Sequence, residues 1–178
     1  MLRIFISGGC KNGKSYFAQW LAKGQSEGKM YYLATMRPCD SEDYERIERH
    51  RQERYGWGFT TIEQPVDILR CLNICDTRAS FLLDSTTALL ANEMFPEDGN
   101  VNLDAPEKVA DDLAILCKQV NNIVIVSDYI YSDAMLYDEL TEAYRKGLAF
   151  IDRILAAVCD VVLEVAFGSI VIHKGREV

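Results

Sequence analysis

The sequence predicts an α/β fold, in which a mostly parallel sheet is covered by helices on both faces. Short apolar runs alternate along the chain with longer segments of helical spacing, and this alternation is typical of βαβ units. The run at 122–126 (NIVIV) is apolar at four of five positions, which favours a strand buried on both faces. At 178 residues the chain suits one domain with a sizeable core, and we predict a single domain over residues 1–178.

The first half of the chain contains four predicted strands and three predicted helices. The strands are short runs bounded by polar residues or glycine, at 2–7, 29–34, 60–63 and 81–83. A helix begins at Ser15, and a second one, capped by Asp40 or Ser41, continues to Arg54. Its early acids and late arginines complement the helix dipole. A third helix follows Asp84 and extends to about residue 94.

The second half continues the alternation. Residues 96–106 form a predicted loop, and a helix from there to about Val120 leads into the strand 122–126. We predict that residues 133–158 are mostly helical, with an interruption at Gly147. The last strands, 161–165 and 170–173, are expected to pair around a turn at Phe167 and Gly168 and to form an antiparallel edge.

Composition limits the partners. The net charge of −8 argues against binding to nucleic acid or to an anionic membrane surface. The six cysteines include no CxxC pair and there are only two histidines, so reduced thiols are favoured over a zinc site. No apolar run is long enough to cross a membrane, and we predict a cytoplasmic protein.

A phosphate-binding motif lies between the first predicted strand and the helix after it. The pattern is G-x-x-x-x-G-K-[ST], and its residues are Gly8, Gly9, Cys10, Lys11, Asn12, Gly13, Lys14 and Ser15. The glycines allow consecutive backbone N–H groups to face phosphates, the lysine supplies a cation and the serine hydroxyl suits Mg²⁺. A chance glycine-rich turn is the alternative, but the strand–loop–helix context favours a P-loop. We therefore predict a P-loop NTPase-like three-layer sandwich that binds a nucleoside triphosphate.

Two acids at strand ends are candidates for the metal site. Asp84 ends the run 81–83, where P-loop proteins usually carry an acid that reaches Mg²⁺, so we predict Ser15 and Asp84 as the magnesium-binding side chains. The alternative for Asp84 is the N-cap of the following helix. Asp128, after the strand 122–126, is a weaker competitor for the metal role.

His50 lies in the segment RIERHRQER, on a charged helix face where a lone histidine is usually solvated. The arginines around it either hold nucleotide phosphates or pair with Glu45, Glu48 and Glu53. His173, near the end of the chain, belongs to no motif and is interpreted as structural.

Several segments together resemble one enzyme family. After the P-loop come Tyr32-Leu33-Ala34-Thr35, then Asp40 and Glu42 ahead of Arg46-Ile47 and His50, then Arg54, Trp57, Thr60 and Glu63, and finally the stretch from Leu83 through Asp84 to Asn92. In this order they are similar to the bifunctional adenosylcobinamide kinase / adenosylcobinamide-phosphate guanylyltransferase family of cobalamin biosynthesis. The second half of the chain differs more from the pattern of this family. Where the family has V-S-N-E-V-G this chain has Val126-Ser127-Asp128-Tyr129-Ile130-Tyr131, without the Asn-Glu pair and the glycine. Farther on, Ala149 and Asp152 replace a glycine and an asparagine.

The resemblance implies two activities. One phosphorylates the aminopropanol hydroxyl of adenosylcobinamide with ATP or GTP, and the other transfers GMP from GTP to that phosphate. In the family the transfer passes through a guanylylated histidine, and His50 matches that position. The resemblance also implies Mg²⁺, a corrinoid substrate and a homotrimer. Two alternatives remain: a small-molecule kinase that uses Lys14, Ser15 and Asp84 without a covalent intermediate, and a diverged GTP-binding protein without catalysis.

Overall fold

The computed structural model describes residues 1–26 and 28–175, and it describes residue 46 by its backbone alone. In this part of the chain a seven-stranded sheet has the order β3-β2-β4-β5-β1-β6-β7. All pairings are parallel except that of β6 with β7. The strands are β1 (Leu2–Gly8), β2 (Met30–Ala34), β3 (Phe59–Glu63), β4 (Ser80–Asp84), β5 (Asn122–Val126), β6 (Val161–Ala166) and β7 (Ser169–Lys174).

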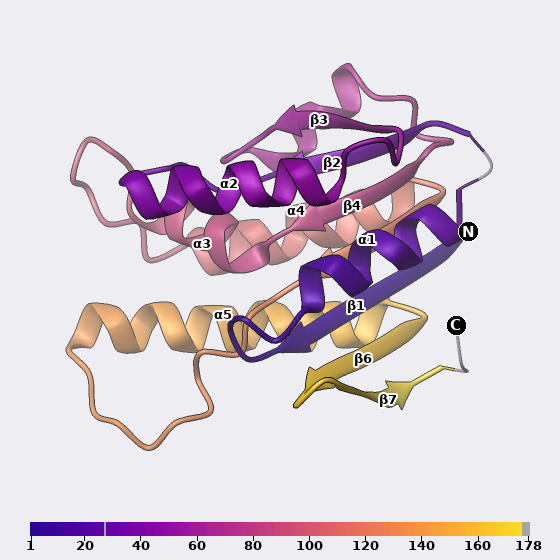
Figure 1. Ribbon diagram of the computed structural model, residues 1–178. Coiled ribbons are helices and arrows are strands. Elements are labelled where there is room, and N and C mark those ends of the chain that lie inside the picture. The colour runs from indigo at the N-terminus through magenta and orange to yellow at the C-terminus, as the bar shows by residue number, and fades with distance from the viewer. Residues whose placement is uncertain (27, 176–178) are drawn as a thin grey trace.

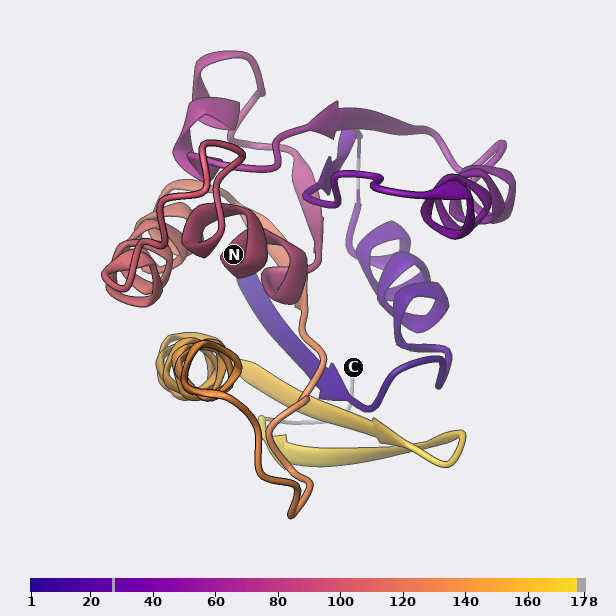
Figure 2. The ribbon, with the colours of Figure 1, turned by 90° about the vertical axis from the view of Figure 1, so that its left-hand side faces the viewer.

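Helices cover both faces of the sheet (Figure 1, Figure 2). Their bounds are α1 (Lys14–Gly24), α2 (Ser41–Glu53), the short 3₁₀ helix η1 (Ile68–Asn73), α3 (Thr86–Met94), α4 (Ala105–Gln119) and α5 (Glu139–Val158). In Figure 2, α3, α4 and α5 lie on one side of the strands, and α1 and α2 lie on the other. The prediction of an α/β three-layer sandwich is confirmed. None of the described helices is both long and apolar enough to span a bilayer.

The core is divided by the sheet into two clusters, and β4 contributes to both. Phe81 and Leu83 pack with side chains from α3, α4 and α5, whereas Leu82 packs on the α1 side with Ala18. All three of these β4 side chains are fully buried. A strand that is covered on both faces needs apolar residues at successive positions, which explains why the run 81–83 does not alternate.

One helix boundary differs from the prediction. The segment 128–138 is not helical, and α5 begins only at Glu139, so the helix predicted from residue 133 was placed too early. The side chain of Asp133 accepts a hydrogen bond from the backbone N–H of Met135, a local turn that competes with helix formation. The helix starts where Asp138 caps it, with its carboxylate accepting from the N–H groups of Leu140 and Thr141.

The expected interruption at Gly147 is also wrong, because α5 continues through it to Val158. A Cβ at Gly147 would lie 2.6 Å from the ring of Pro106 at the start of α4. The glycine therefore allows α4 and α5 to pack closely. The final antiparallel pair is confirmed, with the turn at Phe167 and Gly168, both of which have positive φ angles.

Candidate nucleotide site

The P-loop follows β1 and turns tightly at the carboxyl edge of the sheet. A side chain at Gly8 would collide with the carbonyl of Val165 on β6, so the position requires glycine. The amide of Asn12 donates a hydrogen bond to the same carbonyl, which ties the loop to β6. Gly13 has a φ of 87° and precedes α1, and this left-handed conformation favours glycine. The loop thus places the N-terminal end of α1 toward the same edge, as phosphate binding requires.

Lys14 is almost completely buried and its ammonium has two close partners. Its Nζ donates to the carbonyl of Gly9 at 2.6 Å and to a carboxylate oxygen of Asp128 at 2.7 Å. Asp128 follows β5, and its backbone N–H donates to the hydroxyl of Thr87 at 3.0 Å. The sequence suggested Asp128 only as a competing metal ligand, whereas the structure shows it as the counterion of the P-loop lysine.

Asp84 lies at the carboxyl end of β4. Its carboxylate accepts a hydrogen bond of 3.0 Å from the hydroxyl of Tyr32, which lies on the neighbouring strand β2. Asp84 is not the N-cap of α3. That position belongs to Ser85, whose hydroxyl accepts from the N–H of Ala88. The capping alternative is therefore wrong, and the Asp84 carboxylate faces the pocket described next.

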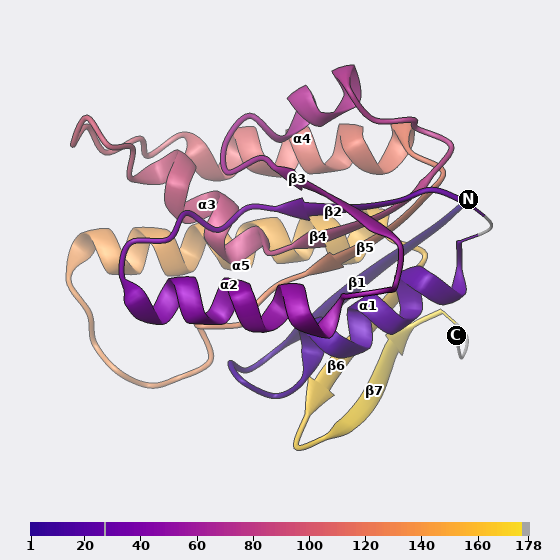
Figure 3. The ribbon, with the colours of Figure 1, turned by 45° about the horizontal axis from the view of Figure 1, so that its top comes forward.

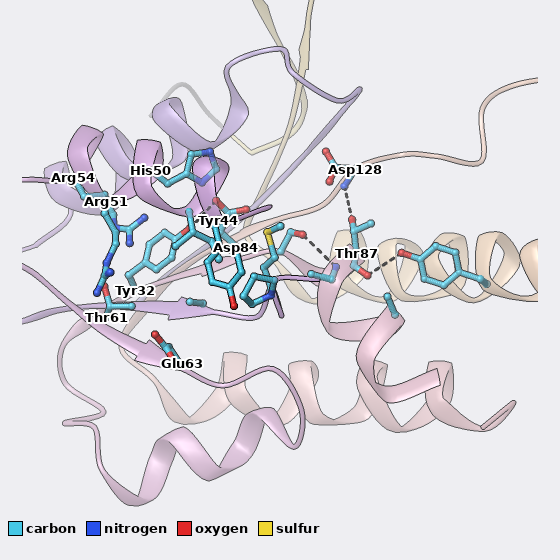
Figure 4. Close-up of a pocket in the computed structure, with 18 residues that line it drawn as sticks. Tyr32, Tyr44, His50, Arg51, Arg54, Thr61, Glu63, Asp84, Thr87 and Asp128 are labelled. Atoms are coloured by element: carbon cyan, nitrogen blue, oxygen red, sulfur yellow. Dashed lines mark hydrogen bonds between the residues drawn. The ribbon is translucent and has the colours of Figure 1, made fainter. Parts of the chain in front are cut away.

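Figure 3 shows α2 and α1 on the same side of the strands. A pocket of about 450 Å³ lies between α2 and the carboxyl ends of β2, β4 and β5 (Figure 4). Its polar lining includes His50 and Arg51 from α2, together with Asp84 and Asp128. Apolar side chains complete one wall, at Met36, Pro38, Tyr44 and Ile47. Asp128 lines the pocket and also binds the ammonium of Lys14, so the pocket adjoins the P-loop. His50, which lines the same pocket, therefore lies at the same edge of the sheet as the P-loop.

Two of the arginines near His50, Arg51 and Arg54, form no ion pair with the nearby glutamates among the described side chains. Arg54 is buried instead, and its guanidinium carbon lies 3.6 Å from the ring centroid of Tyr32. The side chain of Arg46, which also belongs to this segment, lies outside the described residues. His173 is on β7, where its ring contacts the carboxylate of Glu164 at 2.8 Å.

The residues predicted for magnesium offer a hydroxyl and a carboxylate. Hard oxygen donors of this kind suit Mg²⁺, which usually takes one or two protein ligands and completes its octahedron with phosphates and water. Within the described residues there is no group of three or more His, Cys, Asp or Glu side chains that could hold a metal alone. The Ser15 hydroxyl and the Asp84 carboxylate are the types of donor that suit a Mg²⁺ ion whose other ligands are nucleotide phosphates and water.

A model of one enzyme family matches residues 4–172, nearly the whole chain: cobinamide kinase / cobinamide phosphate guanyltransferase. The chain belongs to this family. It is thus related to nucleotide-binding P-loop transferases of cobalamin biosynthesis, as the sequence resemblance predicted. No curated protein sequence matches the chain.

Solved structures share the fold at low sequence identity. A Pyrococcus horikoshii OT3 protein is 12% identical, with 99% of this chain and 87% of that chain covered and a TM-score of 0.55. An ATP synthase subunit from Nanoarcheaum equitans is 10% identical, with 93% and 45% covered and a TM-score of 0.50. At these identities the likeness is one of fold.

One of the departures from the family pattern lies in a buried polar cluster beside the site. Asp152 on α5 accepts hydrogen bonds from the hydroxyl of Ser127 at 3.1 Å and from that of Tyr131 at 2.8 Å. Burial raises the pKa of Asp152 to about 6, although both hydrogen bonds act to lower it. Sequence reasoning identified this position as unusual but did not predict the cluster, because its members lie on separate elements.

Proposed function

We propose that this protein phosphorylates adenosylcobinamide with ATP or GTP and then transfers GMP from GTP to the product, through a guanylylated His50. One observation carries the proposal. A single pocket is lined by His50, the family's nucleophile position, and by Asp128, which pairs with the P-loop lysine. A nucleotide whose phosphates extend from the P-loop into this pocket would bring them toward the imidazole.

The guanylyl transfer has two balanced steps. The unprotonated ring nitrogen of His50 attacks the α-phosphorus of GTP, a P–N bond forms, and the bond to the bridging oxygen breaks to release pyrophosphate. A phosphate oxygen of the corrinoid acceptor then attacks the same phosphorus, and the P–N bond breaks to restore the imidazole. In this proposal Lys14 balances charge on the departing pyrophosphate, after its Nζ exchanges the Gly9 carbonyl or the Asp128 carboxylate for a phosphate oxygen.

The kinase reaction is assigned to the P-loop. The hydroxyl of the aminopropanol arm attacks the γ-phosphorus and releases its proton to solvent, and the nucleoside diphosphate leaves with the bridging oxygen. Backbone N–H groups between Gly8 and Ser15 and the Lys14 ammonium hold the phosphates. Ser15 and Asp84 are the proposed magnesium-binding side chains. When bound, Mg²⁺ would neutralise phosphate charge in either transfer.

The homotrimer and the cytoplasmic location expected from the sequence belong to this proposal. The edge strand β7 supports self-association, because Ile170, Val171 and Ile172 are 47%, 45% and 39% exposed. Light scattering on the purified protein measures the oligomeric state, and a monomer at micromolar concentration would contradict the trimer.

The covalent step is tested with GTP labelled at the α-phosphate. After denaturation, the parent protein should retain label that is lost in mild acid and persists in alkali, as a phosphoramidate does. The variant His50→Asn should bind nucleotide through the P-loop and retain kinase activity, but should carry no label and transfer no GMP. Equal labelling of His50→Asn would place the nucleophile elsewhere. Kinase activity with no adduct in the parent would favour a plain kinase, and GTP binding with neither activity would favour a non-catalytic binder.

A further inference from the structure

The pocket-lining side of α2 carries a second functional group beside His50. Arg54 lies four residues after His50, and both side chains line the pocket. Residues at this spacing lie on the same face of a helix, one turn apart. The backbone N–H of Arg54 donates to the carbonyl of His50 at 3.2 Å, so the last turn of α2 fixes the two residues relative to each other.

Arg54 is oriented by its surroundings. It is 8% exposed, and its guanidinium lies over the ring of Tyr32. The Tyr32 hydroxyl in turn donates to Asp84 at 3.0 Å. This hydrogen bond holds the Tyr32 ring, and the Arg54 guanidinium above it, near the carboxyl edge of the sheet, where the nucleotide phosphates are expected. Figure 4 shows His50, Arg54 and Tyr32 on the same side of the pocket.

The Arg54 guanidinium is buried, and among the described side chains no carboxylate pairs with its charge. Nη1 of Arg54 is inaccessible to solvent and has no hydrogen-bond acceptor among the described atoms. A buried cation without a counterion is unfavourable, and stacking on one tyrosine offsets this only partly. A planar fork of N–H donors matches the oxygens of a phosphate group. A phosphoryl group bound beside His50 would supply both the negative charge and the hydrogen-bond acceptors that the Arg54 guanidinium lacks.

We propose that Arg54 is a catalytic residue that binds the guanylyl phosphate, the α-phosphoryl group, as it moves onto His50 and off again. This inference rests on the proposed function. During attack by the His50 nitrogen, negative charge increases on the non-bridging oxygens of the α-phosphorus while pyrophosphate departs. The same oxygens carry charge again when the acceptor phosphate displaces the imidazole. A fixed guanidinium one turn away stabilises both transition states, and it takes no part in transfer of the γ-phosphoryl group.

The test compares Arg54→Met with Arg54→Lys and with Arg49→Met, in the full-length protein. Methionine keeps an unbranched side chain against Tyr32 but has no charge, and lysine keeps the charge but loses the fork. Arg49 is an exposed arginine of α2 outside the pocket and serves as the matched control. In Arg54→Met, the rate of labelling from α-labelled GTP and the rate of transfer to the acceptor should each fall by about 10²–10³-fold. Kinase turnover should stay within a few-fold, Arg54→Lys should recover part of the loss, and Arg49→Met should match the parent.

Three outcomes would overturn the inference. Labelling of Arg54→Met at the parent rate shows that Arg54 does not act on the α-phosphoryl group. Normal labelling with a raised KM for the acceptor alone would assign Arg54 to the acceptor's own phosphate. Kinase and guanylyl transfer that fall together, with a lowered melting temperature, would assign it a structural role. If the parent forms no adduct, the proposed function fails instead, so the two failures are distinguishable.

Discussion

Replacing Asp152 by asparagine should change how the stability of the protein depends on pH. Asp152 is 5% exposed, and one of its carboxylate oxygens, Oδ1, has no hydrogen-bond partner among the described atoms. Burial raises its pKa from 3.8 to about 6, against the hydrogen bonds from Tyr131 and Ser127, which favour the charged form. Asparagine has nearly the same shape and its carbonyl can accept from the same hydroxyls, but it carries no charge at any pH.

The magnitude follows from linkage. Above pH 6 the carboxyl is ionised in both the native and the unfolded protein, and the native state carries the full cost of burying the charge. As the pH falls from about 6 to 3.8, the native state binds a proton that the unfolded state does not, so the contribution of Asp152 to stability improves. The displacement of the pKa corresponds to about 3 kcal/mol. Asp152→Asn should therefore be more stable than the parent by up to about 3 kcal/mol at pH 7.5, and by almost nothing near pH 4.

Urea denaturation of both proteins at several pH values between 4 and 7.5 measures this difference. Asp111, an exposed carboxylate on α4, provides the control, and Asp111→Asn should stay within about 0.5 kcal/mol of the parent throughout. A stability difference between Asp152→Asn and the parent that does not vary with pH would refute the reasoning. The reasoning would also be refuted if Asp152→Asn became less stable relative to the parent as the pH rises.

The remaining predictions concern the P-loop and the strand-end acid. Lys14→Ala should abolish both activities, because it removes the cation that is expected to balance phosphate charge in either transfer. Steady-state assays of the two reactions measure this, and activity within a few-fold of the parent would contradict it. Asp84→Asn should leave the melting temperature nearly unchanged and weaken Mg²⁺-dependent turnover, seen as a higher Mg²⁺ concentration for half-maximal rate. Unchanged Mg²⁺ dependence would remove Asp84 from the metal site.

The sequence allowed prediction of features that depend on neighbours along the chain. The strands, the P-loop, the α2 N-cap at Asp40 and the final hairpin all follow from patterns within about ten residues. The helix predicted from residue 133 failed because the local turn at Asp133 is supported by a contact with a residue farther along the chain. The carboxylate of Asp133 forms an ion pair with Arg145 on α5 at 2.9 Å, which supports a folded-back loop that no local pattern reveals.

The candidate site was predictable in its residue types but not in its pairings. The motif contains Lys14, but its contact with Asp128 depends on the adjacency of β1 and β5 in the sheet. The burial of Arg54 is a similar case, since in the sequence it lies among exposed charges and only the position of Tyr32 on β2 covers its guanidinium. Identification of such groups requires the tertiary structure.

The most direct test of the central claim is a single-turnover chase of the guanylylated protein. The parent is labelled with α-labelled GTP, freed of nucleotide and pyrophosphate, and then mixed with adenosylcobinamide phosphate. If His50 carries GMP between donor and acceptor, the label should leave the protein and appear in the corrinoid product, one for one and without further GTP. Label that stays on the protein while fresh GTP supports product formation would contradict the account.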